Sequence, residues 1–280
     1  MLALVVTVRA EDAEVASDEL WAMGVVAIEE RSTGQRHSDG TEEVELWTSL
    51  GDDADAIAAE LTALRYHWRF EEIDATVSET WREFAVPTWV ADDLVVYPAW
   101  QDDITVSHDD RHGDVISISI EPGATFGMGD HPTTVLTMRA MRGVLVSGDS
   151  VLDVGCGSGV LAIAACRLGA AAAVGIDIST AAVPTTIANA ERNGVHDLVS
   201  VSTTPLAEIA GAFDIVLANI LAPALIQLAS DLRRVLAPSG ALIISGILAD
   251  HHDHVLVALA PLRIVDQIDL DGWTAITLRE

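Results

Sequence analysis

The sequence S-V-L-D-V-G-C-G-S-G-V-L-A-I-A-A-C-R-L-G-A-A-A-A-V-G-I-D, residues 150–177, decides the fold of this chain. Its first apolar run, 151–154, predicts a short buried strand, and the alanine-rich segment 160–168 has the apolar spacing of a helix. A second apolar run, 173–176, predicts another buried strand. The order strand, helix, strand is typical of a parallel sheet with helices packed on its faces.

Three glycines, Gly155, Gly157 and Gly159, separate the first strand from the helix. They let the backbone turn tightly and approach a ligand that a Cβ atom would obstruct. The second strand ends in Asp177, 22 positions after the first glycine. Because an acidic residue at such a distance commonly accepts hydrogen bonds from the ribose hydroxyls of a nucleotide, the stretch predicts a site for a nucleoside-containing ligand.

Two nucleoside ligands fit this outline, NAD and S-adenosylmethionine. A dinucleotide fingerprint has the spacing G-x-G-x-x-G and rests its pyrophosphate on the amides of a helix N-terminus. This chain has G-x-G-x-G, with Val160 at the place of the third glycine and Asp153 two residues before the first. A carboxylate there repels a pyrophosphate but attracts, directly or through water, the ammonium group of a methionine moiety. We therefore favour S-adenosylmethionine.

The composition limits the class of protein. The chain has 280 residues, half of them apolar, which suffices for one large domain or two small ones. It has no apolar run as long as a membrane helix, and residues 1–12 lack the basic start of a signal peptide. The two cysteines, Cys156 and Cys166, indicate neither a disulfide framework nor a zinc site. We expect a cytoplasmic protein that needs no metal and no membrane.

The net charge of −28 would repel the phosphates of nucleic acids, so we expect no direct binding to RNA or DNA. Two interpretations of the charge stay open. It steers a basic protein substrate toward the chain, or it serves solubility or adaptation to salt. The acidic residues are scattered rather than gathered in blocks, which favours the second interpretation.

Residues 1–77 predict a small domain of their own, in the order βαββαβ. The expected elements are the strand 2–8, the helix 11–23, the strand 25–29, a turn over 32–40, the strand 44–48, the helix 52–64 and the strand 68–77. This order is typical of a ferredoxin-like α+β sandwich. Nothing in it suggests catalysis, so we expect it to recognise a substrate; the alternative is a stabilising appendage.

Residues 78–92 predict a linker, and 93–280 predict the second domain, which begins with a pair of strands over 94–100 and 115–120. After the strand that ends at Asp177, helices and strands alternate to the end of the chain. The expected elements are the helices 179–193, 222–236 and 250–259, the strands 198–201, 213–218 and 241–245, a P-S-G turn at 238–240, and the strands 262–270 and 273–278 joined by D-G.

This alternation predicts an α/β fold with a doubly wound parallel sheet that contains one antiparallel strand. Ligands of such sheets bind at the carboxyl ends of the strands. Gly155, Asp177 and Asn219 all stand at such ends, so we expect them to share one site.

The loop E-P-G-A-T-F-G-M-G-D-H-P-T-T, residues 121–134, leads into a helix that begins near Pro132. Two interpretations stay open. In one, a hydroxyl caps the helix and His131 is hydrogen-bonded within the loop. In the other, the loop closes over the ligand, with Phe126 against its apolar parts and Thr134 reaching a polar group.

With these residues in place, the chain resembles a known family, the bacterial ribosomal protein L11 methyltransferases (PrmA). The similar segments are P-G-A-T-F-G-M-G-D-H-P-T-T, V-L-D-V-G-C-G-S-G-V-L-A-I-A-A, G-I-D-I, N-A-E-R-N-G-V, A-N-I-L-A and S-G-I-L-A, and the resemblance covers nearly the whole chain. The glycine loop is common to many methyltransferases, whereas F-G-x-G-x-H-P-T-T together with N-I-L-A is much more specific. The chain departs from the family pattern at 124–125, Met128 and Asp130, which bears on the loop's contacts and not on the fold.

The resemblance implies a seven-stranded, Rossmann-like class I methyltransferase domain, preceded by a ferredoxin-like domain that holds the protein substrate. It implies transfer of methyl groups from S-adenosylmethionine to lysine side chains and the N-terminal amine of ribosomal protein L11, and we expect a monomer. The residue pattern and the resemblance together assign these residues to the cofactor: Phe126, Gly127, Thr134, Asp153, Gly155, Gly157, Asp177 and Asn219.

Methyl transfer to an amine needs a neutral lone pair aligned opposite the sulfur. We expect Asn219 to orient the amine without a general base; His131 as a base is the alternative that we do not favour. Many amino-methylating enzymes have N-P-P-aromatic here, so Ile220 and Leu221 leave more room and predict multiple methylation. Rival classes are a methyltransferase of another protein lysine or a small-molecule amine, an NAD oxidoreductase, and a non-enzymatic binding module.

Overall fold

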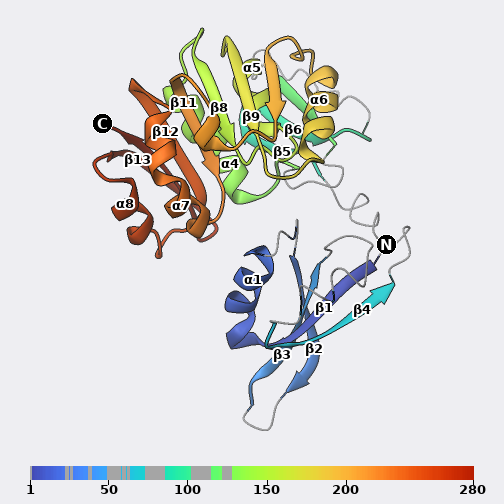
Figure 1. The fold of residues 1–280 in the computed structure, drawn as a ribbon. Helices are drawn as coiled ribbons and strands as arrows, with labels where there is room; N and C mark the ends of the chain where they lie inside the picture. The colour runs from blue at the N-terminus through green and yellow to red at the C-terminus, as the bar shows by residue number, and fades with distance from the viewer. Residues whose placement is uncertain are drawn as a thin grey trace. The chain divides into compact units, whose positions relative to one another are not determined.

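The computed structural model describes residues 2–22, 25, 28–36, 40–48, 58, 61, 64–72, 86–101, 115–121 and 128–280. The chain divides into two compact units, Met1–Ala85 and Val86–Glu280 (Figure 1). Within the described ranges, no helix combines the length and the apolar character that crossing a bilayer requires.

The first unit contains a four-stranded antiparallel sheet with the strand order β2-β3-β1-β4 (Figure 1). Its elements are β1 (Leu2–Arg9), a 3-10 turn (Ala10–Asp12), α1 (Ala13–Ala22), β2 (Ile28–Arg36), β3 (Glu42–Thr48) and β4 (His67–Glu72). Alternate residues of β1, Leu4, Val6 and Val8, are buried in one cluster with Ala16 and Leu20 of α1. The period of two along the strand therefore determines which face of the sheet the helix covers.

Strand β2 differs from the sequence prediction, which placed a strand over 25–29 and a turn over 32–40. The S-T-G segment belongs to the strand, because the Thr33 hydroxyl donates a hydrogen bond to the Glu43 carbonyl of β3 at 2.9 Å. A register shift after Ser32 absorbs the glycine. Local turn residues are thus overridden by pairing with the neighbouring strand.

Three expectations fall mostly outside the described residues: the helix 52–64, the end of the strand 68–77 and most of the linker 78–92. The last part of that predicted linker is described. Residues 88–91 form β5, which pairs with the strand that follows, so they belong to the second unit.

The second unit begins with a three-stranded sheet of order β5-β6-β7. Its strands are β5 (Thr88–Ala91), β6 (Leu94–Pro98) and β7 (Ile116–Ile120). β5 is antiparallel to β6, and β6 is parallel to β7. Val96 and Ile118 of this sheet are buried in one cluster with Met138 and Met141 of the first long helix, so the small sheet shares a core with the rest of the unit.

The main sheet has the strand order β10-β9-β8-β11-β12-β14-β13 (Figure 1). Its strands are β8 (Ser150–Val154), β9 (Ala172–Ile176), β10 (Val199–Ser202), β11 (Phe213–Asn219), β12 (Leu236–Leu248), β13 (Arg263–Leu270) and β14 (Trp273–Arg279). β14 is antiparallel to both of its neighbours, whereas β8 to β12 are parallel. The predicted mixed sheet with one antiparallel strand is confirmed, and its chain order reverses between β8 and β11.

Helices cover both faces of this sheet. They are α4 (Pro132–Val144), α5 (Val160–Arg167), α6 (Ala182–Arg192), α7 (Ala222–Arg234) and α8 (Asp253–Leu259), with a 3-10 turn at Leu206–Glu208. Val151 of β8 belongs to the cluster of α4 and α5, while the next residue, Leu152, belongs to the cluster of α7 and α8. Alternate side chains therefore enter opposite cores, which explains why both Val151 and Leu152 are apolar.

Two predicted details near the C-terminus have different outcomes. The P-S-G turn at 238–240 is wrong as a separate element, because it lies within β12 as a bulge opposite Asp214. The D-G hairpin is confirmed, since Asp271 and Gly272 both have positive φ, 50° and 83°, as a two-residue turn between strands requires. The helices α6 and α8 each begin three residues later than expected.

Candidate functional site

The site predicted from the sequence lies at the carboxyl ends of three adjacent strands. The last residue of β8, Val154, pairs with Ile176 of β9 and with Ala218 of β11. The residues that follow these three directly are Gly155, Asp177 and Asn219. They therefore stand at one level of the sheet, on both sides of the point where the strand order reverses, which is where doubly wound sheets bind ligands.

The glycine loop has a backbone that only glycine adopts readily. The φ angles of Gly155, Gly157 and Gly159 are 76°, 53° and 80°. A Cβ atom on Gly155 would lie 2.5 Å from Ile220 Cγ2, and one on Gly159 would lie 2.6 Å from Thr186 Cγ2. Both conformation and space thus require glycine at these two positions.

Asp177 faces the glycine loop. One carboxylate oxygen accepts a hydrogen bond from the Gly157 amide and the other from the Ser179 amide, each at 2.8 Å. These bonds fix the carboxylate at the end of β9, and each oxygen retains a lone pair for a further donor such as a ribose hydroxyl.

Ile178 was not singled out by the sequence reasoning, but the structure places it beside this carboxylate with 95% of its surface exposed. An isoleucine that exposed next to a carboxylate at a strand end offers an apolar surface that a flat base could cover. Its signal in the sequence is an apolar residue directly after the acidic strand end, in G-I-D-I.

Asp153 is fully buried at the end of β8. Its Oδ2 accepts a hydrogen bond from the Ala162 amide at 3.2 Å, while its Oδ1 is buried without a partner among the described residues. Burial raises the pKa of Asp153 to about 7, against the effect of the Ala162 bond and with a further increase from the charge of Asp177. An orphaned carboxylate oxygen next to the glycine loop fits an ammonium group, held directly or through water.

Asn219 and Thr134 contact each other across the site. The side-chain amide of Asn219 donates to Thr134 Oγ1 at 3.4 Å. Thr134 is 1% exposed, so it lies behind Asn219 rather than at the surface of the site. Within the described part of the chain, Asn219 Oδ1 has no partner and can accept a hydrogen bond from a ligand.

His131 caps α4, the helix that carries Thr134. Its Nδ1 accepts a hydrogen bond from the Thr133 amide at 3.3 Å and lies 2.8 Å from the Thr133 hydroxyl. Its ring meets Trp273 edge-on, with 5.2 Å between the ring centroids. Burial lowers the pKa of His131, against a smaller increase from Asp130. The imidazole is therefore neutral at pH 7 and is itself the cap, in place of the predicted hydroxyl.

The other loop residues expected at the site, Phe126 and Gly127, lie outside the described residues. Whether the loop 121–134 closes over a ligand stays a prediction.

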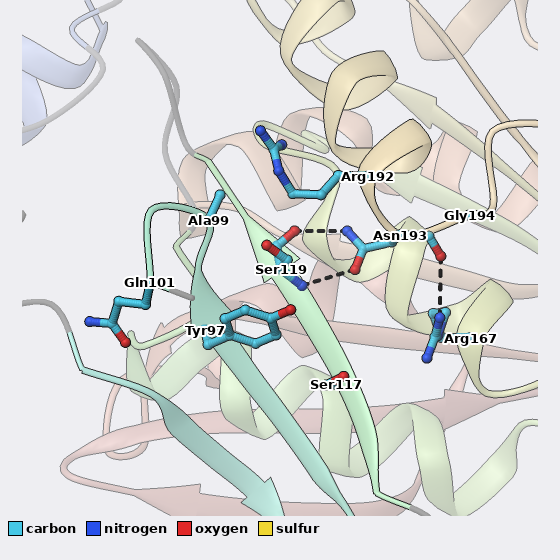
Figure 2. A pocket seen from close by; sticks show the side chains of 9 residues that line it. All are labelled: Tyr97, Ala99, Gln101, Ser117, Ser119, Arg167, Arg192, Asn193 and Gly194. Carbon is cyan, nitrogen blue, oxygen red and sulfur yellow. Dashed lines mark hydrogen bonds between the residues drawn. The ribbon is translucent and has the colours of Figure 1, made fainter. Parts of the chain in front are cut away.

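A hollow of about 600 Å³ lies elsewhere in the second unit (Figure 2). Its lining residues come from β6, β7 and the last turns of α5 and α6, and they are Tyr97, Ala99, Gln101, Ser117, Ser119, Arg167, Arg192, Asn193 and Gly194. None of them is a predicted site residue. Helix α5 begins at the carboxyl edge of the sheet and runs toward the opposite edge. The hollow, which lies at the last turn of α5, is therefore separate from the strand ends described above.

Both cysteines are buried and reduced. Burial raises the pKa of the Cys156 thiol in the glycine loop well above its usual value, and burial raises the pKa of Cys166 to about 11. Both thiols are therefore protonated at pH 7. In the described ranges, no three His, Cys, Asp or Glu side chains gather as metal ligands; the expected absence of a metal stays a prediction.

The chain is similar to proteins of one family. The family model described as ribosomal protein L11 methyltransferase (PrmA) matches residues 1–280. A protein of that name from Brevibacillus brevis is 37% identical over 206 residues, which cover 72% of this chain and 64% of the relative. Another, from Geobacter sulfurreducens, is 46% identical over 176 residues, covering 63% of this chain and 56% of the relative.

A crystal structure of ribosomal protein L11 methylase from Lactobacillus delbrueckii subsp. bulgaricus is 32% identical. It superposes with a TM-score of 0.63 over 69% of this chain and 98% of the solved chain. The match to the curated relatives from Brevibacillus brevis and Halalkalibacterium halodurans spans 64% and 65% of their length. The fold is thus the α/β methyltransferase fold with a mixed central sheet, and the chain belongs to the ribosomal protein L11 methyltransferase (PrmA) family.

Proposed function

We propose that this chain transfers methyl groups from S-adenosylmethionine to the lysine side chains and the N-terminal amine of ribosomal protein L11. The names of its relatives support the substrate. The observation that carries the proposal is the register of Val154, Ile176 and Ala218, because it brings the glycine loop, Asp177 and Asn219 to one level at the switch point of the sheet.

The cofactor residues are proposed as follows. Asp153 takes the ammonium of the methionine moiety, Gly155 and Gly157 let the backbone approach, and Asp177 accepts from the ribose hydroxyls beside the exposed Ile178. The buried carboxylate argues against NAD, whose pyrophosphate it would repel. Further residues proposed to line the cofactor site are Phe126, Gly127, Thr134 and Asn219.

S-adenosylmethionine supplies an electrophilic methyl group bonded to a sulfonium. The acceptor must be a neutral amine, and a lysine with a pKa of about 10.4 needs on the order of 4–5 kcal/mol to lose its proton at pH 7. Burial beside a positive charge lowers that pKa, and alignment supplies much of the remaining advantage. Asn219 contributes the alignment: its amide nitrogen is engaged by Thr134, so its Oδ1 is presented to an N–H of the amine.

The segment after Asn219 bears on how many methyl groups are added. Ile220 and Leu221 stand where many amino-methylating enzymes have proline. We expect multiple methylation of each amine, because these residues leave more room around the acceptor nitrogen. A product that stops at the monomethyl level with excess S-adenosylmethionine would contradict this expectation.

The first unit is proposed to be a ferredoxin-like domain that recognises the protein substrate. Its strand order, β2-β3-β1-β4, and its βαβ start support the topology. The second unit, with seven strands in its main sheet, is proposed as the catalytic domain. A monomeric state, a cytoplasmic location, and independence of metal and nucleic acid complete the proposal; the net charge of −28 supports the last point.

Intact mass spectrometry tests the function. Ribosomal protein L11 is incubated with this chain and S-adenosylmethionine, and increments of whole methyl groups are expected that disappear in Asn219→Ala. The chain itself contains no lysine, so every methylated lysine in the reaction belongs to the added substrate. An L11 that stays unmodified while S-adenosylmethionine binds would refute the substrate and leave the cofactor.

A second candidate, methylation of a small-molecule amine, would use the same strand ends. It predicts turnover of free amines by residues 86–280 alone, whereas the main proposal predicts that the first unit is needed.

A further inference from the structure

Helix α6 presents two buried asparagines to the edge strand β7. Asn189 and Asn193 are one helical turn apart, which places them on the same face of the helix. They are 0% and 7% exposed. A buried side-chain amide without hydrogen-bond partners would destabilise the chain. The partners of these two asparagines therefore indicate their role.

Asn193 holds the end of β7 in the manner of a neighbouring strand. Its Oδ1 accepts from the Ser119 amide at 2.9 Å, and its Nδ2 donates to the Ser119 carbonyl at 2.7 Å (Figure 2). The same Nδ2 donates to the Asn189 carbonyl at 2.8 Å. Asn193 thus links β7 to α6 and contacts no part of the cofactor site.

Asn189 forms the same pair of hydrogen bonds with the backbone of Glu121, two residues after Ser119. Its Oδ1 accepts from the Glu121 amide at 3.0 Å, and its Nδ2 donates to the Glu121 carbonyl at 2.9 Å. Unlike Asn193, it also reaches the glycine loop, because Nδ2 donates to the Ser158 carbonyl at 2.9 Å. Arg192 donates to Oδ1 at 3.0 Å, so two donors face the oxygen and two carbonyls face the nitrogen.

The two partners of Asn189 belong to different parts of the second unit. Ser158 lies between the second and third glycines of the glycine loop. Glu121 is the residue that directly follows β7. One side-chain amide therefore holds the glycine loop against the carboxyl end of β7.

We propose that Asn189 is a positioning residue for S-adenosylmethionine, because one fully bonded side-chain amide fixes the glycine loop at Ser158 to the end of β7 at Glu121. The proposal rests on the function proposed above. It assigns to Asn189 no contact with the cofactor. A change at Asn189 alters how the glycine loop is held, while the same change at Asn193 alters the attachment of β7 and the last turn of α6 and leaves the bond to Ser158 in place.

The substitution Asn189→Asp tests this with little change of shape. Aspartate keeps the acceptor for the Glu121 amide but places a charged oxygen against the Glu121 and Ser158 carbonyls, where a donor is needed. The two carbonyls raise the pKa of the new carboxyl group, whereas the Arg192 guanidinium, which donates to its other oxygen, lowers it. Protonation at low pH restores one donor, so the variant should recover part of its affinity as the pH falls.

Isothermal titration calorimetry with S-adenosylmethionine gives the dissociation constant at pH 6 and pH 8 for the wild type, Asn189→Asp and Asn193→Asp. The control carries the same substitution on the same face of the same helix. We expect Asn189→Asp to bind about tenfold or more weakly than wild type at pH 8, a difference of about 1.4 kcal/mol, and to recover part of this at pH 6. Asn193→Asp should lower the melting temperature with a dissociation constant within about twofold of wild type.

Hydrogen exchange gives a second readout that does not need the cofactor. In Asn189→Asp, the amides of 155–160 and of Glu121 should exchange faster than in wild type, whereas in Asn193→Asp the faster exchange should be confined to β7 and the last turn of α6. Equal dissociation constants for both variants would overturn the positioning role. A wild type that does not bind S-adenosylmethionine would instead overturn the proposed function, and the exchange pattern would then judge the coupling alone.

Discussion

The substitution Asp153→Asn should stabilise this chain at high pH while it weakens cofactor binding. Asp153 is fully buried, one of its oxygens has no partner among the described residues, and its pKa is about 7 in place of 3.8. The folded chain therefore binds this proton more tightly than the unfolded chain. The free energy of unfolding consequently falls as the pH rises between these two values and levels off above pH 7.

The size of this effect on the free energy of unfolding follows from the pKa shift of Asp153. A change of about 3 pKa units at 1.36 kcal/mol each gives a full effect on the order of 4 kcal/mol, of which about 2–3 kcal/mol develops between pH 5 and pH 8. Asparagine keeps the acceptor for the Ala162 amide and carries no charge. The variant should therefore gain about 2–3 kcal/mol relative to wild type between these pH values.

Hydrogen exchange of the β8 amides measures the free energy of unfolding of the second unit alone. The same variant should bind S-adenosylmethionine about tenfold more weakly at pH 8, because the ammonium loses its carboxylate. Stability and affinity would then move in opposite directions, as expected of a group that is retained for binding. A stability difference that is equal at pH 5 and pH 8 would refute the reasoning about Asp153.

Three further substitutions test the geometry of the strand ends. Gly246→Ala should lower the rate of methyl transfer by about tenfold or more, measured in single turnover, because φ is 85° and the new Cβ would lie 2.6 Å from the Ile220 carbonyl oxygen beside the acceptor site. Asp177→Ala should raise the dissociation constant for S-adenosylmethionine by about tenfold or more, since it removes the acceptor for the ribose together with the bond that holds the Gly157 amide. Gly272→Ala, in the turn between β13 and β14, should cost about 1 kcal/mol in thermal unfolding at unchanged affinity, because its φ is 83°; a loss of affinity there would show that the hairpin supports the site.

The common level of Gly155, Asp177 and Asn219 could be predicted from the sequence because each stands at the end of a strand. The apolar runs before Gly155, Asp177 and Asn219 mark where the strands stop, and parallel strands bring their carboxyl ends together. The D-G turn could be predicted for a similarly local reason, since few residues other than Asn, Asp and Gly accept positive φ. In these places the local pattern and the tertiary structure agree.

The parts that could not be predicted depend on partners distant in sequence. The sequence of the S-T-G segment of β2 predicts a turn, and only the hydrogen bond from Thr33 to Glu43 shows that the segment belongs to the strand. The P-S-G segment likewise remains in β12 because Phe213 and Ile215 pair on either side of its bulge. Asn189 and Asn193 carried one available signal, two amides at helical spacing, but their partners at the end of β7 are about 70 residues away.

The buried thiol of the glycine loop makes the motion of that loop measurable without any label. Cys156 is 5% exposed and its raised pKa keeps it protonated, so an alkylating reagent can modify it only while the loop is open. The rate of modification then reports how often the loop opens, and Cys166 on α5 gives the corresponding rate for the adjacent helix. The chain has just these two cysteines, so the native protein needs no added label: Cys156 reports the opening of the glycine loop, and Cys166 gives the rate with which it is compared.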